Sequence, residues 1–140
     1  MNQVIEIKLT NNATLPTKGS EDAAAYDLKC LNQILVIKGE LRLVKTGVHM
    51  SIPKGYYGQI LSRSRLASKG IIVTGGVIDS DYRGEIIIIV QNISQEDYTF
   101  EAGDKVAQIA ILKLFEGELK IVEDLSETKR GEGGFGSTGL

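Results

Sequence analysis

Glu85-Ile-Ile-Ile-Ile-Val-Gln91 is the stretch of this sequence that decides the fold. Its apolar core is too short for an ordinary helix, and its residues are branched at Cβ, which favours extended backbone. Uninterrupted apolar character over this length is typical of a strand buried on both faces. We therefore predict a central, fully covered strand here.

Shorter strand patterns flank this segment. Ile5, Ile7 and Leu9 alternate with charged residues, which predicts a half-buried strand. Branched or aromatic residues between glycine turns predict five further strands, at residues 34–38, 41–52, 56–62, 105–115 and 119–125. Only residues 66–69 resemble a helical turn. Many short strands without a long amphipathic helix favour an all-β sandwich or barrel of jelly-roll type.

Composition narrows the class of protein. The chain has 140 residues, enough for one domain with its own core. Its net charge is −2 and it has no basic block, which argues against a nucleic-acid polymer as partner. The single cysteine favours a reducing compartment, and we find neither a signal-peptide pattern nor a membrane-length apolar run. We expect an intracellular protein of the cytoplasm or nucleus, with no membrane partner.

The end of the sequence combines flexibility with ligand chemistry. Five of the last eleven residues are glycine, yet they enclose Arg130, Phe135, Ser137 and Thr138. A guanidinium and two hydroxyls suit a phosphate chain, and an aromatic ring can cover a planar group. We predict a β domain over residues 1–125 and a flexible Gly-rich arm over residues 126–140 that closes on a ligand. A merely solubilising tail is the alternative.

The richest internal segment is Gly75-Gly-Val-Ile-Asp-Ser-Asp-Tyr-Arg-Gly84. Asp79 and Asp81 lie two residues apart, so on extended backbone they would face the same side. Such carboxylates can hold a metal or act as a general base, and Tyr82 would add a flat wall beside them. An ordinary hairpin turn is the alternative.

Three more polar positions interrupt the strand pattern. Asp27 follows small residues at the start of a strand, where a turn or cap is the simpler reading. The segment from Ser62 to Ala67 carries two arginines and two hydroxyls at a strand end, which suits a phosphate as well as a solvated loop. Gln108 stands in an apolar strand; if it faces inward, its amide needs a partner that a ligand could supply.

Several chemistries are excluded. His49 is the only histidine and lies in a strand pattern, so a Ser-His-Asp triad has no support. Cys30 with one histidine cannot form a zinc site of the usual ligand number. The phosphate-binding P-loop pattern is absent. Carboxylate, arginine and glycine-backbone chemistry remains, which points to phosphoryl groups with a hard divalent cation.

Taken together, five segments resemble the five motifs of the trimeric deoxyuridine triphosphatases (dUTP pyrophosphatases) in order and spacing. They are Ala24-Ala-Tyr-Asp-Leu28, Arg63-Ser-x-Leu-Ala67, Gly76-Val-Ile-Asp-Ser-Asp-Tyr-Arg-Gly84, Gly103-Asp-Lys-Val-Ala-Gln108 and Arg130-Gly-x-Gly-Gly-Phe-Gly-Ser-Thr-Gly139. The resemblance implies a jelly-roll-like (β-clip) distorted barrel and a homotrimer with shared active sites. It also implies Mg2+-dependent hydrolysis of dUTP to dUMP and pyrophosphate, which limits uracil in DNA and supplies dUMP for thymidylate synthesis.

The resemblance also assigns roles to residues. Asp79 would activate the attacking water, Tyr82 would pack on the deoxyribose, and Asp27 would hold Mg2+ through water. The hairpin backbone, including Gly76, Val77 and Ile78, would read uracil. The remaining substrate-binding positions it implies are Arg63, Ser64, Arg65 and Gln108, with Arg130, Phe135, Gly136, Ser137 and Thr138 from a neighbouring subunit's arm.

The sequence departs from the family pattern in the second motif, where Ser62 replaces a usual proline and Arg65 a usual glycine. The charge of Arg65 would help bind phosphates, or its bulk would hinder them. Two alternatives stay open: a dCTP deaminase of similar fold, which would need a buried glutamate such as Glu85 as proton shuttle, and a non-catalytic nucleotide-binding relative.

Overall fold

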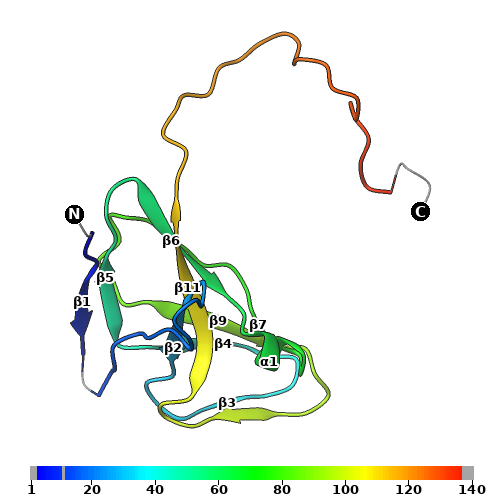
Figure 1. The fold of residues 1–140 in the computed structure, drawn as a ribbon. Coiled ribbons are helices and arrows are strands. Elements are labelled where there is room, and N and C mark those ends of the chain that lie inside the picture. The colour runs from blue at the N-terminus through cyan, green and yellow to red at the C-terminus, as the bar shows by residue number, and fades with distance from the viewer. Residues whose placement is uncertain (1–2, 11, 137–140) are drawn as a thin grey trace.

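The computed structural model describes residues 3–10 and 12–136, and this part of the chain is almost entirely β (Figure 1). In chain order its elements are β1 (Glu6–Leu9), β2 (Tyr26–Lys29), β3 (Ile34–Val36), β4 (Leu41–Lys45), β5 (Val48–Ser51), β6 (Tyr56–Leu61), α1 (Ser64–Ala67), β7 (Ile71–Val73), β8 (Val77–Ile78), β9 (Ile87–Asn92), β10 (Tyr98–Phe100) and β11 (Lys105–Lys113). The predicted all-β class is confirmed. The expected helical turn is present as α1, beginning two residues early.

The strands pair antiparallel in four sheets, ordered β1-β5, β10-β3, β2-β11-β6-β8 and β4-β9-β7. Within the described ranges these pairings do not close into a barrel. The apolar faces of the sheets meet in one core, to which Leu28, Val36, Val90, Phe100 and Ile109 contribute fully buried side chains.

The predicted central strand is β9, but it is not buried on both faces as expected. Ile88 and Val90 are fully buried, whereas Ile87 and Ile89 are only half-buried. Within the described residues no second layer covers the outer face of the β4-β9-β7 sheet: Leu41 and Leu43 on the neighbouring strand are 53% and 60% exposed. One side of this apolar sheet therefore remains open in the single chain.

Asn92, at the end of β9, is a buried polar residue whose hydrogen bonds are complete. Its Nδ2 donates to the carbonyl oxygens of Val36 (2.9 Å) and Glu96 (2.8 Å). Its Oδ1 accepts the Ser94 backbone N–H and hydroxyl, at 2.9 and 2.7 Å. This satisfied network offsets the cost of burying the amide and ties β9 to β3.

The single strand predicted over residues 41–52 is two strands, β4 and β5, because of Gly47. This glycine has φ of 69°, a left-handed conformation that ends a strand. A Cβ there would lie 2.6 Å from the Cβ of Ala13, so space also requires glycine.

The strand predicted over residues 119–125 is wrong. The last strand ends at Lys113, and residues 114–136 run away from the body (Figure 1). A strand needs a hydrogen-bonded neighbour, and no strand of the described chain lies beside this segment: Leu119 and Ile121 are 97% and 99% exposed. The boundary at residue 125 stays a prediction.

Candidate active site

The turn between β7 and β8 borders a hollow of about 720 Å³. Gly75 and Gly76 have φ of 71° and 118°, conformations that L side chains rarely adopt. A Cβ on Gly76 would lie 2.7 Å from the Cβ of Ile60, so this turn can pack only with glycine. Gly76 and Val77 line the hollow, and Ile78 pairs with Gly58 in β6. The hairpin therefore presents bare backbone to any planar ligand in the hollow.

Ser62 and Gln108 also line this hollow. The Gln108 side chain faces Ser62 and donates from Nε2 to its carbonyl oxygen at 2.9 Å. The Ser62 hydroxyl accepts the backbone N–H of Val73 at 2.8 Å. Ser62, which departs from the family pattern, thus joins β6 to the hairpin strand through a bond that proline could not make.

Asp27 lies beside Gln108 in the register of β2 and β11 and is 9% exposed. Its carboxylate faces two cations: Arg63 Nε lies 3.7 Å from Oδ1, and Lys105 Nζ lies 3.2 Å from Oδ2. Arg63 Nη1 also donates to the Lys105 carbonyl oxygen, at 3.4 Å. A buried carboxylate with two cationic partners is a preformed charge cluster. Lys105 was not among the predicted site residues, because its position in a strand pattern carried no signal.

Ser64 and Arg65 begin α1 directly after Arg63, and both are exposed. The predicted phosphate-binding segment is therefore accessible, with its arginine at position 63 held against Asp27. Arg65 extends this positive surface on the outer side of the helix.

Asp79 opens a turn that continues through Ser80 and Asp81, so the extended backbone assumed for the same-side placement of Asp79 and Asp81 is not present here. Its carbonyl oxygen accepts the Tyr82 N–H at 3.1 Å. The Tyr82 hydroxyl donates to the Glu85 carbonyl oxygen at 2.8 Å. Asp79 and Tyr82 are both exposed, as groups that meet a ligand from solvent must be.

Two residues outside the predicted substrate-binding set, Glu85 and His49, join this turn to β5 and to the glycine just before it. The Glu85 carboxylate accepts the Gly47 N–H at 2.8 Å, and His49 Nδ1 lies 2.9 Å from the Arg83 carbonyl oxygen. These contacts join positions 34 to 38 residues apart, which local sequence patterns do not reveal.

The Asp79 turn and the Asp27 cluster lie at different ends of β6. Ile78 pairs with Gly58, so continuing this register would place Asp79 opposite Tyr57. At the other end of β6, Leu61 pairs with Gln108. Tyr57 and Leu61 are four positions apart along the strand, roughly 13 Å at the rise of a β-strand. One chain therefore does not bring the predicted base and the predicted phosphate ligands into contact.

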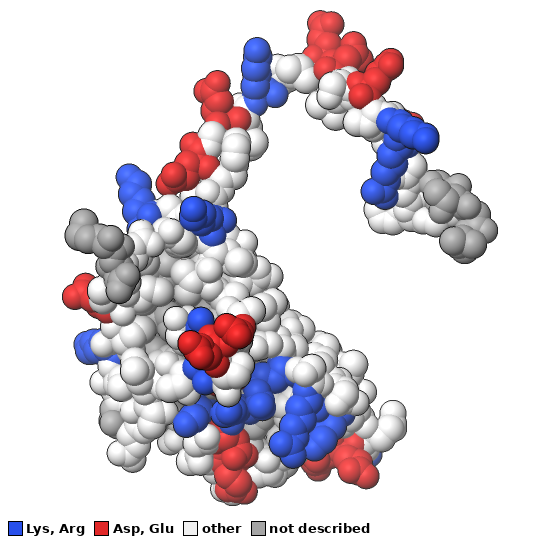
Figure 2. Space-filling view, viewed as in Figure 1, with Lys and Arg blue, Asp and Glu red and all other residues white. Residues whose placement is uncertain are grey.

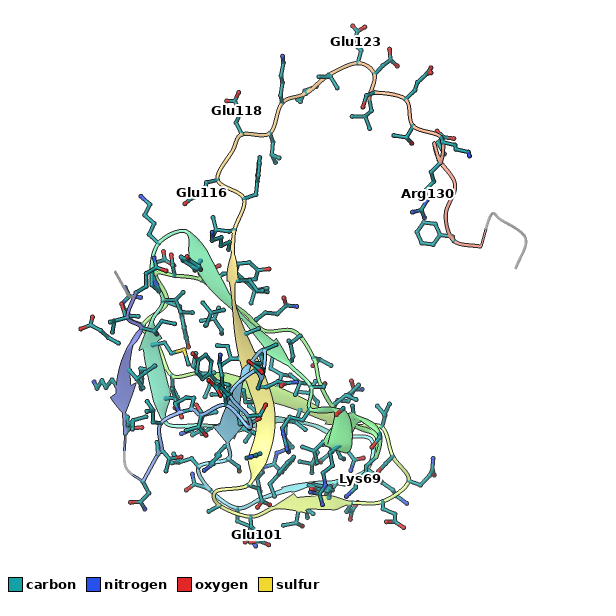
Figure 3. The ribbon with its side chains drawn as sticks, viewed as in Figure 1. Lys69, Glu101, Glu116, Glu118, Glu123 and Arg130 are labelled. Carbon is teal, nitrogen blue, oxygen red and sulfur yellow. The ribbon has the colours of Figure 1, made fainter. Side chains whose placement is uncertain are left out.

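The arm contributes a third, separate group. Arg130 Nε donates to the Gly133 carbonyl oxygen at 2.6 Å, forming a turn far from the β body (Figure 3). Phe135 and Gly136 are exposed in the same segment. The predicted contacts Ser137 and Thr138 lie outside the described residues.

The described residues contain no group of three or more His, Cys, Asp or Glu side chains able to hold a metal. Cys30 is no nucleophile here, because burial raises the pKa of its thiol, and Sγ donates to the Asn32 carbonyl oxygen at 2.6 Å. No helix in the described ranges is long and apolar enough to cross a membrane.

A β body that presents a hairpin backbone, an amide and paired cations around an open hollow has the features of a nucleotide-binding protein. Comparison with known proteins narrows this class. The dUTPase family model matches residues 11–139. The deoxyuridine 5'-triphosphate nucleotidohydrolase of Paramecium bursaria Chlorella virus 1 is 43% identical over 141 residues, covering all of both chains. The variola virus protein of the same name is 46% identical over 134 residues, covering 96% of this chain and 91% of that one.

Solved structures agree. The dUTPase of Staphylococcus bacteriophage 80alpha with dUpNHpp has a TM-score of 0.92 and 30% identity, covering 99% of this chain and 100% of that one. A mutant dUTPase of phage phi11, described as showing coordination of a structural Mg(II) ion, has a TM-score of 0.81 and 27% identity, covering 87% and 98%. The chain belongs to the dUTPase family, and the predicted jelly-roll-like β fold is confirmed.

Proposed function

We propose that this protein hydrolyses dUTP to dUMP and pyrophosphate. The observation that carries the proposal is the hairpin hollow, which Gly76 lines together with the hydrogen-bonded residues Ser62 and Gln108. Backbone N–H and C=O groups at Gly76, Val77 and Ile78 suit the Watson–Crick edge of uracil. A hairpin backbone that approaches the base this closely would leave no room for the extra methyl of thymine.

Asp79 would act as the general base. It accepts a proton from a water whose oxygen forms a bond to the α-phosphorus, and the bond from that phosphorus to the bridging oxygen breaks as pyrophosphate leaves. The backbone hydrogen bond from the Tyr82 N–H to the Asp79 carbonyl oxygen, which keeps both residues in one turn, supports this pairing of roles. Tyr82 would pack on the deoxyribose and exclude a 2'-hydroxyl.

Ser64, Arg63, Arg65 and Gln108 would bind phosphate oxygens. Asp27 suits an indirect contact to Mg2+, because it is one buried carboxylate that already faces two cations and cannot form a metal cage alone. It would hold a water of Mg2+, which prefers oxygen ligands and keeps several waters. When bound, Mg2+ would neutralise charge on the phosphates.

A complete site would combine groups from neighbouring copies in a homotrimer. Three observations support this arrangement: Asp79 and Gln108 lie at different ends of β6, the arm runs away from the body, and the outer face of the β4-β9-β7 sheet is apolar. An arm with exposed Leu119 and Ile121 suits packing on a second copy. Arg130, Ser137 and Thr138 would then clamp the terminal phosphate, with Phe135 and Gly136 over uracil.

The carboxylate of Glu85 argues against a dCTP deaminase, because it accepts a hydrogen bond from Gly47 and so holds the turn. The single cysteine, buried and unpaired, fits action inside the cell.

One assay tests the proposal. The protein is incubated with Mg2+ and either dUTP or dCTP, and pyrophosphate and ammonia are measured. We expect pyrophosphate from dUTP and no ammonia from dCTP. Ammonia from dCTP would favour the deaminase, and nucleotide binding without either product would favour a non-catalytic relative.

A further inference from the structure

The turn that carries Asp79 is attached to the β body at both of its ends. Before the turn, Val77 and Ile78 pair with β6. After the turn, the backbone runs beside β5, where the Ile86 N–H donates to the Val48 carbonyl oxygen at 2.8 Å. Residues 114–136, which carry charges of both signs, run away from the body (Figure 2). Within the described residues, the position of the turn is therefore set by β6 and β5.

Two side chains of the segment around β5 reinforce the second attachment. The buried Thr46 hydroxyl donates to the Ile86 carbonyl oxygen at 2.6 Å. Closer to the turn, His49 Nδ1 lies 2.9 Å from the Arg83 carbonyl oxygen. Of these two contacts, the one from His49 therefore holds the backbone nearer to Asp79.

Arg83 connects His49 to the turn. Its Nη1 donates to the carbonyl oxygens of Ser80 and Tyr82, at 2.6 and 3.2 Å. The Tyr82 N–H in turn donates to the Asp79 carbonyl oxygen at 3.1 Å. Because the backbone of Arg83 is held by His49 and its guanidinium holds the turn, a shift of this backbone would be passed on to Asp79.

The ring of Tyr82 depends on the same segment. Its hydroxyl donates to the Glu85 carbonyl oxygen at 2.8 Å. A Cβ on Gly84 would lie 2.6 Å from Cζ of this ring, so the ring packs directly on the backbone there. The groups proposed to activate water and to contact the sugar, Asp79 and Tyr82, thus both rest on backbone that His49 holds.

We infer that His49 is a positioning residue for hydrolysis of dUTP and that it acts through a hydrogen on Nδ1. The Arg83 carbonyl oxygen can only accept, so the contact requires Nδ1 to be the donor. His49 acts on the base through Arg83 and does not contact the substrate. The inference rests on the proposed function, since Asp79 and Tyr82 are the groups that it positions. Small displacements of such groups lower the rate strongly.

Nitrogen NMR spectroscopy of the full wild-type chain tests the contact. His49 is the only histidine, so the signals of its ring nitrogens are not overlapped by another imidazole. With the ring neutral, we expect Nδ1 to carry the hydrogen and Nε2 to be without one. The opposite assignment would overturn the inference, because Nδ1 could not then donate to Arg83.

Steady-state hydrolysis of dUTP tests the role. His49→Phe keeps a ring without Nδ1, whereas His49→Asn keeps an N–H donor close to the position of Nδ1. Phenylalanine favours strands and asparagine disfavours them, so His49→Phe should have the higher melting temperature. We expect the reverse order for kcat, about tenfold lower in His49→Phe and within about threefold of wild type in His49→Asn. KM should change less than about twofold, because the hairpin that would read the base is held by β6.

Ser51→Asn is the matched control, because Ser51 lies on the same side of β5 as His49 and the same unfavourable residue is introduced. Its kcat should stay within about twofold of wild type. The inference is overturned if His49→Phe keeps the wild-type kcat, or if kcat follows the melting temperature across the variants. Failure of wild type to hydrolyse dUTP would refute the proposed function and with it the role of His49, but not the contact, which the NMR assignment tests separately.

Discussion

The Asp27 cluster and the Arg130 arm are both charged regions of the candidate site. They differ in how far a single chain already holds their side chains in place. Asp27 is buried and faces Arg63 and Lys105 before any ligand arrives. Arg130 Nε donates to the Gly133 carbonyl oxygen within its own turn, away from the body. The first region is a preformed charge cluster, and the second is, under our proposal, completed by a ligand and a neighbouring copy.

Because of this difference, the conformational entropy of the two regions is lost at different steps: folding for the Asp27 cluster and ligand binding for the arm. The cost of fixing the Asp27 cluster is met by the folding of β2 and β11 around it. The cost of fixing the glycine-rich arm is met only when its side chains contact a ligand and a body. The body should therefore determine binding of the base, and the arm should determine catalytic closure.

We expect the largest loss of turnover from replacing one carboxylate oxygen of Asp79, in the β body, by an amide nitrogen. Asp79→Asn keeps the size of the side chain but cannot accept the proton of water, so turnover should fall about 10²–10⁴-fold. Binding of dUpNHpp should be nearly unchanged. Asp81→Asn is the control at a neighbouring exposed carboxylate. If the Asp79→Asn variant hydrolyses dUTP at the wild-type rate, Asp79 is not the general base.

Deletion of residues 130–140 tests the arm. Turnover should fall about 10²–10³-fold, because water exclusion and charge at the terminal phosphate are lost together. The melting temperature should stay nearly constant, since residues 130–136 contribute nothing to the buried core. A large fall in melting temperature would show that the arm belongs to the folded body.

Tyr82 tests sugar selection in the turn. Tyr82→Ala should lower the preference for dUTP over UTP about tenfold, measured as the ratio of kcat/KM values. Tyr82→Phe keeps the ring and loses only the hydroxyl bond to Glu85, so it should keep the preference. Equal preferences in all three proteins would place this selection elsewhere.

The smallest effect concerns Ser62. Ser62→Ala removes the acceptor of the Val73 N–H and should lower the free energy of unfolding by about 1 kcal/mol. Ser68→Ala removes an exposed bond to the Arg65 carbonyl oxygen and should cost less. The free energies of unfolding of both variants are measured by denaturation at equal protein concentrations. If Ser62→Ala is as stable as wild type, the hydrogen bond from the Val73 N–H to the Ser62 hydroxyl does not stabilise the hairpin.

Local pattern predicted the all-β class and the existence of most strands, because alternation and β-branching act within a few residues. It did not predict the half-open face at Ile87 and Ile89, since coverage depends on distant layers. The break at Gly47 depends on contact with Ala13, and the partnership of Lys105 with Asp27 depends on strand register. The strand expected at residues 119–125 has the right side chains, but among the residues that the structure describes no strand lies beside it.

The central claim is that an arm serves another copy's Asp79. Its most direct measurement mixes two inactive parents, the chain lacking residues 130–140 and the full-length Asp79→Asn chain, after subunit exchange has been demonstrated by labelled mass. Hydrolysis of dUTP should return in the mixture, because some sites then combine an intact Asp79 with a neighbour's intact arm. A mixture that exchanges subunits and stays inactive would contradict the account, since each arm would then act on its own chain.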